Sequence, residues 1–156
     1  MSHPGDIRVA DAPFEPDTVL ADFRQRFAQS GGIASFLGQV RGGGVEALEL
    51  THYPPMTLPG MESLGREATR RFALQGFLAH HRIGRMAPGE PIVLVAAAAP
   101  HRRAAFDAVN FAMDHLKTAA WFWKRELADG IWRWIEPRAA DHEDAARWAG
   151  DPQTTP

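Results

Sequence analysis

The stretch IVLVAAAAPHRR, residues 92–103, indicates the fold class more clearly than any other part of the sequence. Its first eight residues are all apolar, without polar alternation, which is typical of a strand buried on both faces. Pro100 should end this strand. The residues from about Arg102 to Thr118 then carry apolar side chains at helical spacing. The sequence therefore predicts a central strand that is followed directly by a helix.

The flanking sequence predicts further helices and strands around this unit. One helix should begin at Pro16-Asp17 and stop at Gly31-Gly32, and another should run from Thr57, as its N-cap, to about Leu74. Strands are expected at 33–41, 45–53, 76–86, 121–127 and 131–136. The first two of these should pair as a hairpin through Gly42–Gly44, and the last two should pair around Asp129-Gly130.

Hairpins mixed with helices favour an α+β fold with a mostly antiparallel sheet and three main helices. The 156 residues are 45% hydrophobic and 23% charged, which suits one globular domain over residues 1–156. Residues 1–10 and 149–156 are expected to be loose ends.

Composition excludes several classes of function. The net charge of −2 excludes a protein that is basic overall, and the aromatic residues lie beside acidic as well as basic ones, so we expect no nucleic-acid partner. The longest apolar run has eight residues, too few to cross a bilayer, and the start lacks a signal-peptide pattern. Without cysteine there is no disulfide, thiolate metal site or thiol nucleophile. We expect a cytoplasmic protein that does not bind membranes.

The basic residues are 15 arginines and only two lysines, Lys117 and Lys124. Lysine, unlike arginine, can lose its proton in an apolar or cationic setting and then act as a base or nucleophile. One helix through both would place them on the same face, whereas a break near Trp121 would bring a helix end and a strand together. Genomic base composition, with one solvated lysine and one lying along tryptophan, explains the pattern equally well.

Two segments could bind an anion. His101, Arg102 and Arg103 open a helix, where cations are unfavourable unless an anion is bound, although the arginines could simply face solvent or pair with Asp107. In the second segment, Gln39 and Arg41 share one strand face before three glycines. A hairpin with a charged end explains this second pattern as well.

The histidines do not predict a metal site. His80 and His81 are adjacent and should face opposite sides of a strand, and neither HxH nor HExxH spacing is present. We therefore expect no bound metal and no cofactor.

Seven short segments occur in an order that is specific, although each is weak alone. They are FLGQVR (36–41), HYPPM (52–56), HRIG (81–84), HR (101–102), MDHLKT (113–118), FWKRE (122–126) and WIE (134–136). With this ordered set, residues 33 to about 148 resemble the large, catalytic subunit of molybdopterin synthase.

The resemblance implies an α/β hammerhead-like fold and a sulfur-transfer reaction. Members of this family convert cyclic pyranopterin monophosphate into molybdopterin by adding two dithiolene sulfurs. The sulfur comes from the thiocarboxylate at the Gly-Gly C-terminus of a small ubiquitin-like subunit. Two large subunits form a central homodimer within a heterotetramer. A chain without cysteine cannot carry the sulfur itself, so an outside donor fits the composition.

The resemblance also implies roles for individual residues. Lys117 corresponds to the family's essential lysine, as a base or attacking amine, and Lys124 to its second active-site lysine, which would stabilise negative charge or hold the thiocarboxylate. The substrate-binding positions fall on Gln39, Val40, Arg41, His101, Arg102, Arg125 and Glu126. Of these, Arg41, His101 and Arg102 would hold the phosphate, with Arg41 reaching across the dimer.

The chain departs from the family pattern at four places. Gln39 stands where a basic residue is common, and the loop after Arg41 is short and all glycine, which puts one substrate contact and the ordering of that loop in doubt. Pro55 replaces a small residue, and Trp121 replaces a proline, so the break between helix and strand must have another cause.

Two other classes of function remain compatible with such a domain. A non-catalytic module could dock a ubiquitin-like protein, but it would need neither the lysines nor the cationic segments. A sensor of a phosphate-bearing ligand would need Arg41, His101 and Arg102, and would leave the two lysines unexplained.

Overall fold

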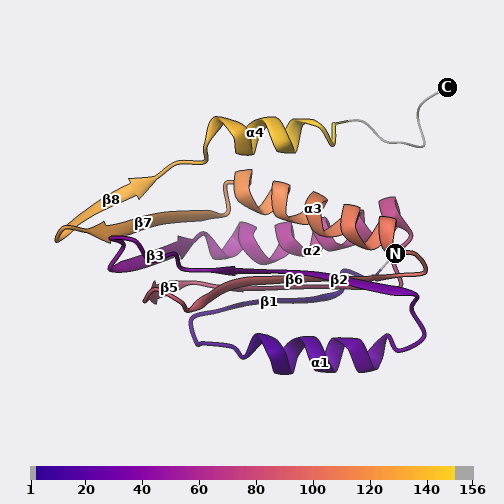
Figure 1. The fold of residues 1–156 in the computed structure, drawn as a ribbon. Coiled ribbons are helices and arrows are strands. Elements are labelled where there is room, and N and C mark those ends of the chain that lie inside the picture. Colours follow the sequence, from indigo (N-terminus) through magenta and orange to yellow (C-terminus); the bar gives the residue numbers. More distant parts are fainter. Residues whose placement is uncertain (1–2, 150–156) are drawn as a thin grey trace.

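The computed structural model describes residues 3–149 and forms one domain of helices and mostly antiparallel strands (Figure 1). The helices are α1 (Pro16–Arg26), α2 (Pro54–Phe72), α3 (Arg102–Thr118) and α4 (Ala139–Ala146). The strands are β1 (Asp6–Ala10), β2 (Gly32–Gln39), β3 (Ala47–His52), β4 (Gly76–Arg82), β5 (Gly84–Met86), β6 (Pro91–Ala99), β7 (Phe122–Ala128) and β8 (Ile131–Ile135). The predicted α+β class is confirmed, although the strands form two sheets.

The first sheet has the strand order β1-β4-β6-β2, with β1 parallel to β4 and the other pairs antiparallel. As predicted, β6 is an inner strand buried on both faces. Val93, Val95, Ala97 and Ala99 of β6 belong to the core beneath α2 and α3, whereas Leu94, Ala96 and Ala98 pack toward α1. Figure 1 shows α1 on one side of the sheet, α2 and α3 on the other, and α4 outside α3.

The second sheet has the order β5-β3-β7-β8 and is antiparallel throughout. The predicted hairpin between residues 33–41 and 45–53 is therefore wrong: β2 pairs with β6, and β3 pairs with β5 and β7. The chain crosses between sheets through Gly42–Gly44, where Gly43 and Gly44 have positive φ values that suit glycine. The predicted hairpin of β7 and β8 is confirmed.

Several predicted boundaries also differ from the structure. The expected loose end at residues 1–10 is wrong for Asp6–Ala10, because this segment pairs with β4 as β1. The expected strand 76–86 divides at Gly84 (φ +87°), where the chain passes from the first sheet to the second. Of the expected loose end at 149–156, residues 150–156 lie outside the described residues.

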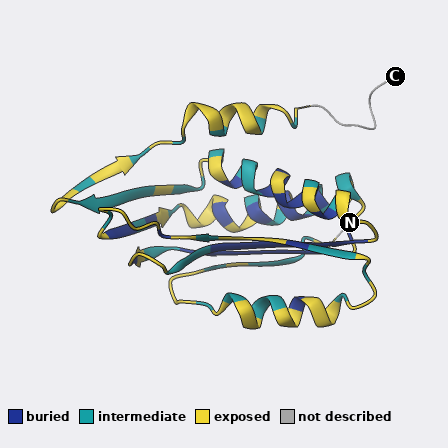
Figure 2. Ribbon diagram, in the orientation of Figure 1, coloured by how far each residue is buried: buried dark blue, intermediate teal, exposed yellow. Residues whose placement is uncertain are grey.

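The helices differ from prediction in two respects. α2 begins at Pro54 rather than at a Thr57 cap, and the Thr57 hydroxyl instead donates to the Tyr53 carbonyl (2.9 Å) from inside the helix. α4 is a fourth helix that the sequence did not indicate, and Figure 2 shows it mostly exposed. No helix in residues 3–149 is long and apolar enough to span a membrane.

Candidate active site

Lys117 and Lys124 line the same two adjoining cavities, of about 290 and 370 Å³. Both cavities also share Gln39, Leu48, Ile92 and Ile135 in their walls. Lys117 lies in the last turn of α3, and Lys124 lies on β7. The structure therefore realises the arrangement in which a helix end and a strand converge, rather than one continuous helix. We call the two cavities together the lysine pocket.

The break between α3 and β7 is fixed by the start of α2. The Trp121 carbonyl accepts hydrogen bonds from the Tyr53 N–H (3.3 Å) and the Thr57 hydroxyl (3.2 Å). The Trp121 indole packs so closely over Gly60 that a Cβ there would collide with it. These contacts turn the chain after Ala119 without the proline that the resemblance leads one to expect.

The environment of Lys124 disfavours its charged form. Burial desolvates the ammonium and lowers the pKa of Lys124, and the nearby cation of Lys117 lowers it further. Asp141 and Glu126 act in the opposite direction. Lys124 thus loses its proton more readily than a solvated lysine, as a group that accepts a proton or attacks carbon requires.

His81 forms an uncharged wall of the pocket. Its imidazole is stacked on the Phe122 ring (4.0 Å between centroids, 13°), and Nδ1 lies 2.8 Å from the Arg82 carbonyl oxygen. Burial, together with the two nearby lysines, lowers the pKa of His81 to about 4. The neutral ring therefore carries its hydrogen on Nδ1, which donates to that carbonyl, and Nε2 has a free lone pair.

The open side of the pocket carries charged groups of both signs. Arg41, whose side chain is 78% exposed, lies 3.4 Å from a carboxylate oxygen of Glu126. Gln39 and Val40 line the same cavity, and the backbone of Val40 is fixed by hydrogen bonds to Gly89 and Glu90. The predicted positions Gln39, Val40, Arg41 and Glu126 thus meet beside the two lysines.

Arg125 is not part of the lysine pocket. Successive residues of a strand face opposite sides, so Lys124 and Glu126 face the pocket and Arg125 faces away. Its guanidinium is 2.8 Å from Glu49 of β3 and 4.4 Å from the centroid of the Trp132 ring. The expected contact of Arg125 with substrate has no support from this geometry, and its observed contacts stabilise the outer face of the second sheet.

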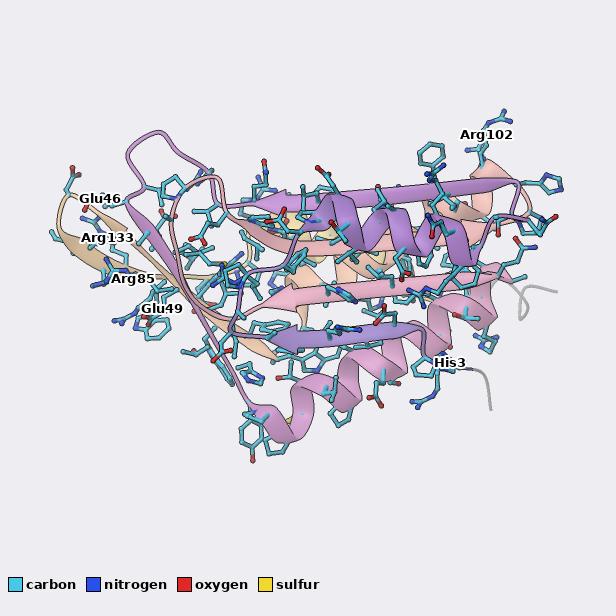
Figure 3. The ribbon with its side chains drawn as sticks, turned by 90° about the horizontal axis from the view of Figure 1, so that it is seen from below. His3, Glu46, Glu49, Arg85, Arg102 and Arg133 are labelled. Carbon is cyan, nitrogen blue, oxygen red and sulfur yellow. The ribbon has the colours of Figure 1, made fainter. Side chains whose placement is uncertain are left out.

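His101 and Arg102 are also remote from the lysines of their own chain. They open α3, whereas Lys117 lies near its end, and the rise of a helix separates them by about 24 Å. Figure 3 shows Arg102 at the opposite end of the molecule from Glu49 and Arg85 of the second sheet. His101 and Arg102 are both exposed. One chain therefore does not bring Arg41, His101 and Arg102 together around a phosphate.

The comparisons with known proteins agree with one another. A family model described as MoaE protein matches residues 9–119. The molybdopterin synthase catalytic subunits of Caulobacter vibrioides and Pseudomonas aeruginosa are 44% and 45% identical to this chain. Each alignment covers 91% of this chain, and the alignments cover 96% and 97% of the two relatives, respectively. The chain belongs to the MoaE protein family. A solved structure titled molybdopterin biosynthesis MoaE protein, from Burkholderia ambifaria, is 40% identical with a TM-score of 0.79, covering 92% of this chain and 97% of its own.

In this MoaE family member, the pocket also has charged residues from the start of α4, which the sequence did not indicate. Arg138 and Asp141, at the start of α4, line the cavity that holds both lysines. Asp141 accepts a hydrogen bond from the Arg138 N–H (2.8 Å), so it occupies the third helical position of a capping box. The spacing of an acid three residues after the cap was visible in the sequence, but arginine is an unusual cap, and nothing local placed this helix beside the lysines.

His80, the neighbour of His81 in this MoaE family member, does not face the lysine pocket. His80 is buried, with Nε2 3.0 Å from the carboxylate of Asp6, and it faces α1 rather than the lysine pocket. Within residues 3–149, no three histidine, aspartate or glutamate side chains are arranged to hold a metal ion.

Proposed function

We propose that this chain is the catalytic subunit of a molybdopterin synthase. It would transfer sulfur from the C-terminal thiocarboxylate of a small ubiquitin-like subunit to cyclic pyranopterin monophosphate, forming the dithiolene of molybdopterin. The observation that carries the proposal is the meeting of Lys117 and Lys124, the only two lysines of the chain, in one pocket. The curated relatives are named catalytic subunits, which fits a chain that needs a partner subunit.

The chemistry explains why two lysines are useful. When sulfur bonds to a substrate carbon and leaves the donor, water supplies the oxygen that converts the donor terminus into a carboxylate. That water gives up both of its protons: one goes to the oxygen displaced from the substrate, and the other goes to the transferred sulfur or to solvent. Because its pKa is lowered, Lys124 suits proton uptake, while the ammonium of Lys117 can donate a proton or stabilise negative charge. We propose no metal or organic cofactor for this step, so turnover should survive dialysis against EDTA.

The substrate phosphate needs more cations than one chain brings together. Arg41 lies at the mouth of the lysine pocket, and His101 and Arg102 form an exposed cationic end of α3. We propose that two large subunits form a homodimer in which His101 and Arg102 of one chain approach Arg41 of the other. With one small subunit at each outer end, this is the heterotetramer that the resemblance implies. We place the reaction in the cytoplasm, and nucleic acid and membranes have no part in it.

The first test is turnover by the purified chain with the cyclic pterin and a thiocarboxylated small subunit, with product detected after oxidation to a fluorescent derivative. The proposal predicts dithiolene product from the wild-type chain, and none from Lys117→Ala although the complex still assembles. A Lys117→Arg chain with near-normal turnover would exclude proton transfer or nucleophilic attack by Lys117. A stable complex without any product would instead favour the docking module.

The shared site has its own test. At cyclic-pterin concentrations well below KM, the Lys117→Ala chain should be inactive alone, and the Arg102→Ala chain should turn over at about a tenth of the wild-type rate. When unfolded and refolded together, they should regain activity, because half of the pockets in a mixed dimer carry both native groups. Failure of the mixture, with mixed dimers demonstrated by differently tagged chains, would refute the shared phosphate site.

A further inference from the structure

Arg147 and Trp148, which follow α4, contact the helix that carries Lys117. Asp114 lies on α3, one turn before Lys117, and its side chain is only 16% exposed. Oxygen Oδ2 of Asp114 accepts hydrogen bonds from the Arg147 guanidinium (2.8 Å) and from the indole N–H of Trp148 (2.6 Å). A carboxylate that pairs with a cation and an indole at such short distances makes strong, directional contacts.

A second contact holds the same end of α4 against α2. The Arg71 guanidinium donates to the Trp148 carbonyl oxygen (2.9 Å). It also lies 5.3–5.9 Å from the ring centroids of Phe72, Phe111 and Trp148, within the range of cation–π attraction. We call the contacts of Asp114 and Arg71 with Arg147 and Trp148 the C-terminal clasp.

The other end of α4 reaches the lysine pocket. Arg138 and Asp141 line the cavity that contains Lys117 and Lys124. Between these two ends, α4 has no buried residue, so its own side chains provide little apolar packing. A short helix without a buried face has little intrinsic stability. The C-terminal clasp therefore holds the far end of α4 against α2 and α3, while its near end follows β8 directly.

We propose that Asp114 is a positioning residue for the lysine pocket: through Arg147 and Trp148 it fixes α4, so that Arg138 and Asp141 stay at the pocket mouth where an anionic substrate enters. This inference rests on the proposed function only for the identity of the substrate, because the attachment of α4 is independent of the reaction. In this arrangement Arg138 supplies a cation for the substrate phosphate. Asp141 holds Arg138 by a backbone hydrogen bond and an ion pair (3.3 Å).

The test compares Asp114→Ala and Trp148→Phe with Asp144→Ala, which removes an exposed carboxylate from α4 itself. Trp148→Phe keeps a smaller aromatic ring beside Arg71 and removes the indole N–H that contacts Asp114, so it serves if Asp114→Ala folds poorly. Amide hydrogen exchange of residues 139–148 should be faster by about tenfold in both clasp variants and unchanged in the control. Exchange of 139–148 as slow as in the control would overturn the inference, whatever the turnover.

Kinetics distinguish positioning from general destabilisation. In the clasp variants the KM for the cyclic pterin should rise about tenfold while kcat changes less than about threefold. Adding Arg138→Ala to Asp114→Ala should raise KM no further than Arg138→Ala alone, because both changes remove the same group from the pocket. Fully additive effects, or an unchanged KM with faster exchange, would refute the role of Asp114. A wild-type chain that makes no product refutes the proposed function instead.

Discussion

The two ends of α3 carry similar charges but differ in structure. At its end, Lys117 faces a walled pocket with Lys124, His81 and Asp141, and Asp114 ties that region to α4. At its start, His101, Arg102 and Arg103 are exposed, and among the described residues none of them has an ion-pair partner. A single chain therefore assembles the lysine pocket at the end of α3, which we call the completed end, and leaves the cations at the start of α3 exposed.

The largest expected effect concerns the completed end. Replacing Lys124 by Arg keeps a cation on β7 but removes an amine whose pKa is lowered by burial and by Lys117 and which can therefore lose its proton more readily. We expect turnover to fall by at least about 100-fold, the usual contribution of a positioned acid–base group. The measurement is single-turnover product formation with saturating small subunit. Arg125→Lys, on the opposite face of the strand, is the matched control, and an active Lys124→Arg chain would show that charge alone is needed.

The second prediction tests whether His81, in the wall of the lysine pocket, is uncharged in the folded protein. An unfolded chain binds a proton on this imidazole near pH 6.5, whereas the folded protein resists protonation until about pH 4. Between these values the unfolded state holds more protons, so stability falls as the pH falls. The loss from this group is on the order of 3 kcal/mol. His81→Asn, whose amide can still donate to the Arg82 carbonyl, should remove that part of the pH dependence.

The measurement is urea unfolding at a series of pH values between 4 and 7. His142→Asn, at an exposed histidine of α4, is the matched control. If His81→Asn loses as much stability on acidification as the wild-type protein, another group is responsible, and His81 is not the neutral wall.

Local sequence signals predicted strand β6 and helix α3 well. The apolar run 92–99, Pro100 and the helical spacing that follows gave β6 and α3 nearly residue by residue. Such signals depend on short-range conformational preferences. The same reasoning predicted the alternative in which Lys117 and Lys124 converge, because the aromatic residues around Trp121 favour a strand.

Long-range contacts account for what the sequence did not show. The pairing of β2 with β6 joins residues far apart in the chain, so the nearby strand β3 was a misleading partner. Alternation along β7 separates Arg125 from Lys124, a point that the family resemblance did not convey. α4 lacks a buried face, and the residues that follow it contact Asp114 and Arg71 of other helices, which are far away in the sequence.

The next prediction concerns the exposed arginines at the start of α3 and their contact with the substrate phosphate. Arg102→Ala should raise the KM for the cyclic pterin about tenfold, because one charge-assisted contact with phosphate is lost. Its free energy of unfolding should change by less than about 0.5 kcal/mol, because the side chain is exposed. Arg103→Ala is the matched neighbour, and we expect a smaller effect on KM. Equal effects of the two would mean that this end attracts substrate only through its overall charge.

The smallest effect is a change in proton affinity at the completed end. Lys117→Gln should raise the pKa of Lys124, because it removes the neighbouring cation, and Glu126→Gln should lower it, because it removes an anion. Labelling lysine with carbon-13 at Cε gives only two side-chain signals in this chain, and only one in Lys117→Gln, so the titration is directly assignable by NMR. Glu143→Gln, on the exposed side of α4, is the control for a general loss of negative charge.

If Lys117→Gln leaves the Lys124 titration unchanged, the two ammonium groups do not interact, and the division of proton uptake and charge stabilisation between them has to be abandoned. If the two variants shift the pKa of Lys124 in opposite directions, Lys117 and Lys124 act as a coupled acid–base pair. The exposed arginines at the start of α3 cannot form such a pair, because a guanidinium group stays protonated.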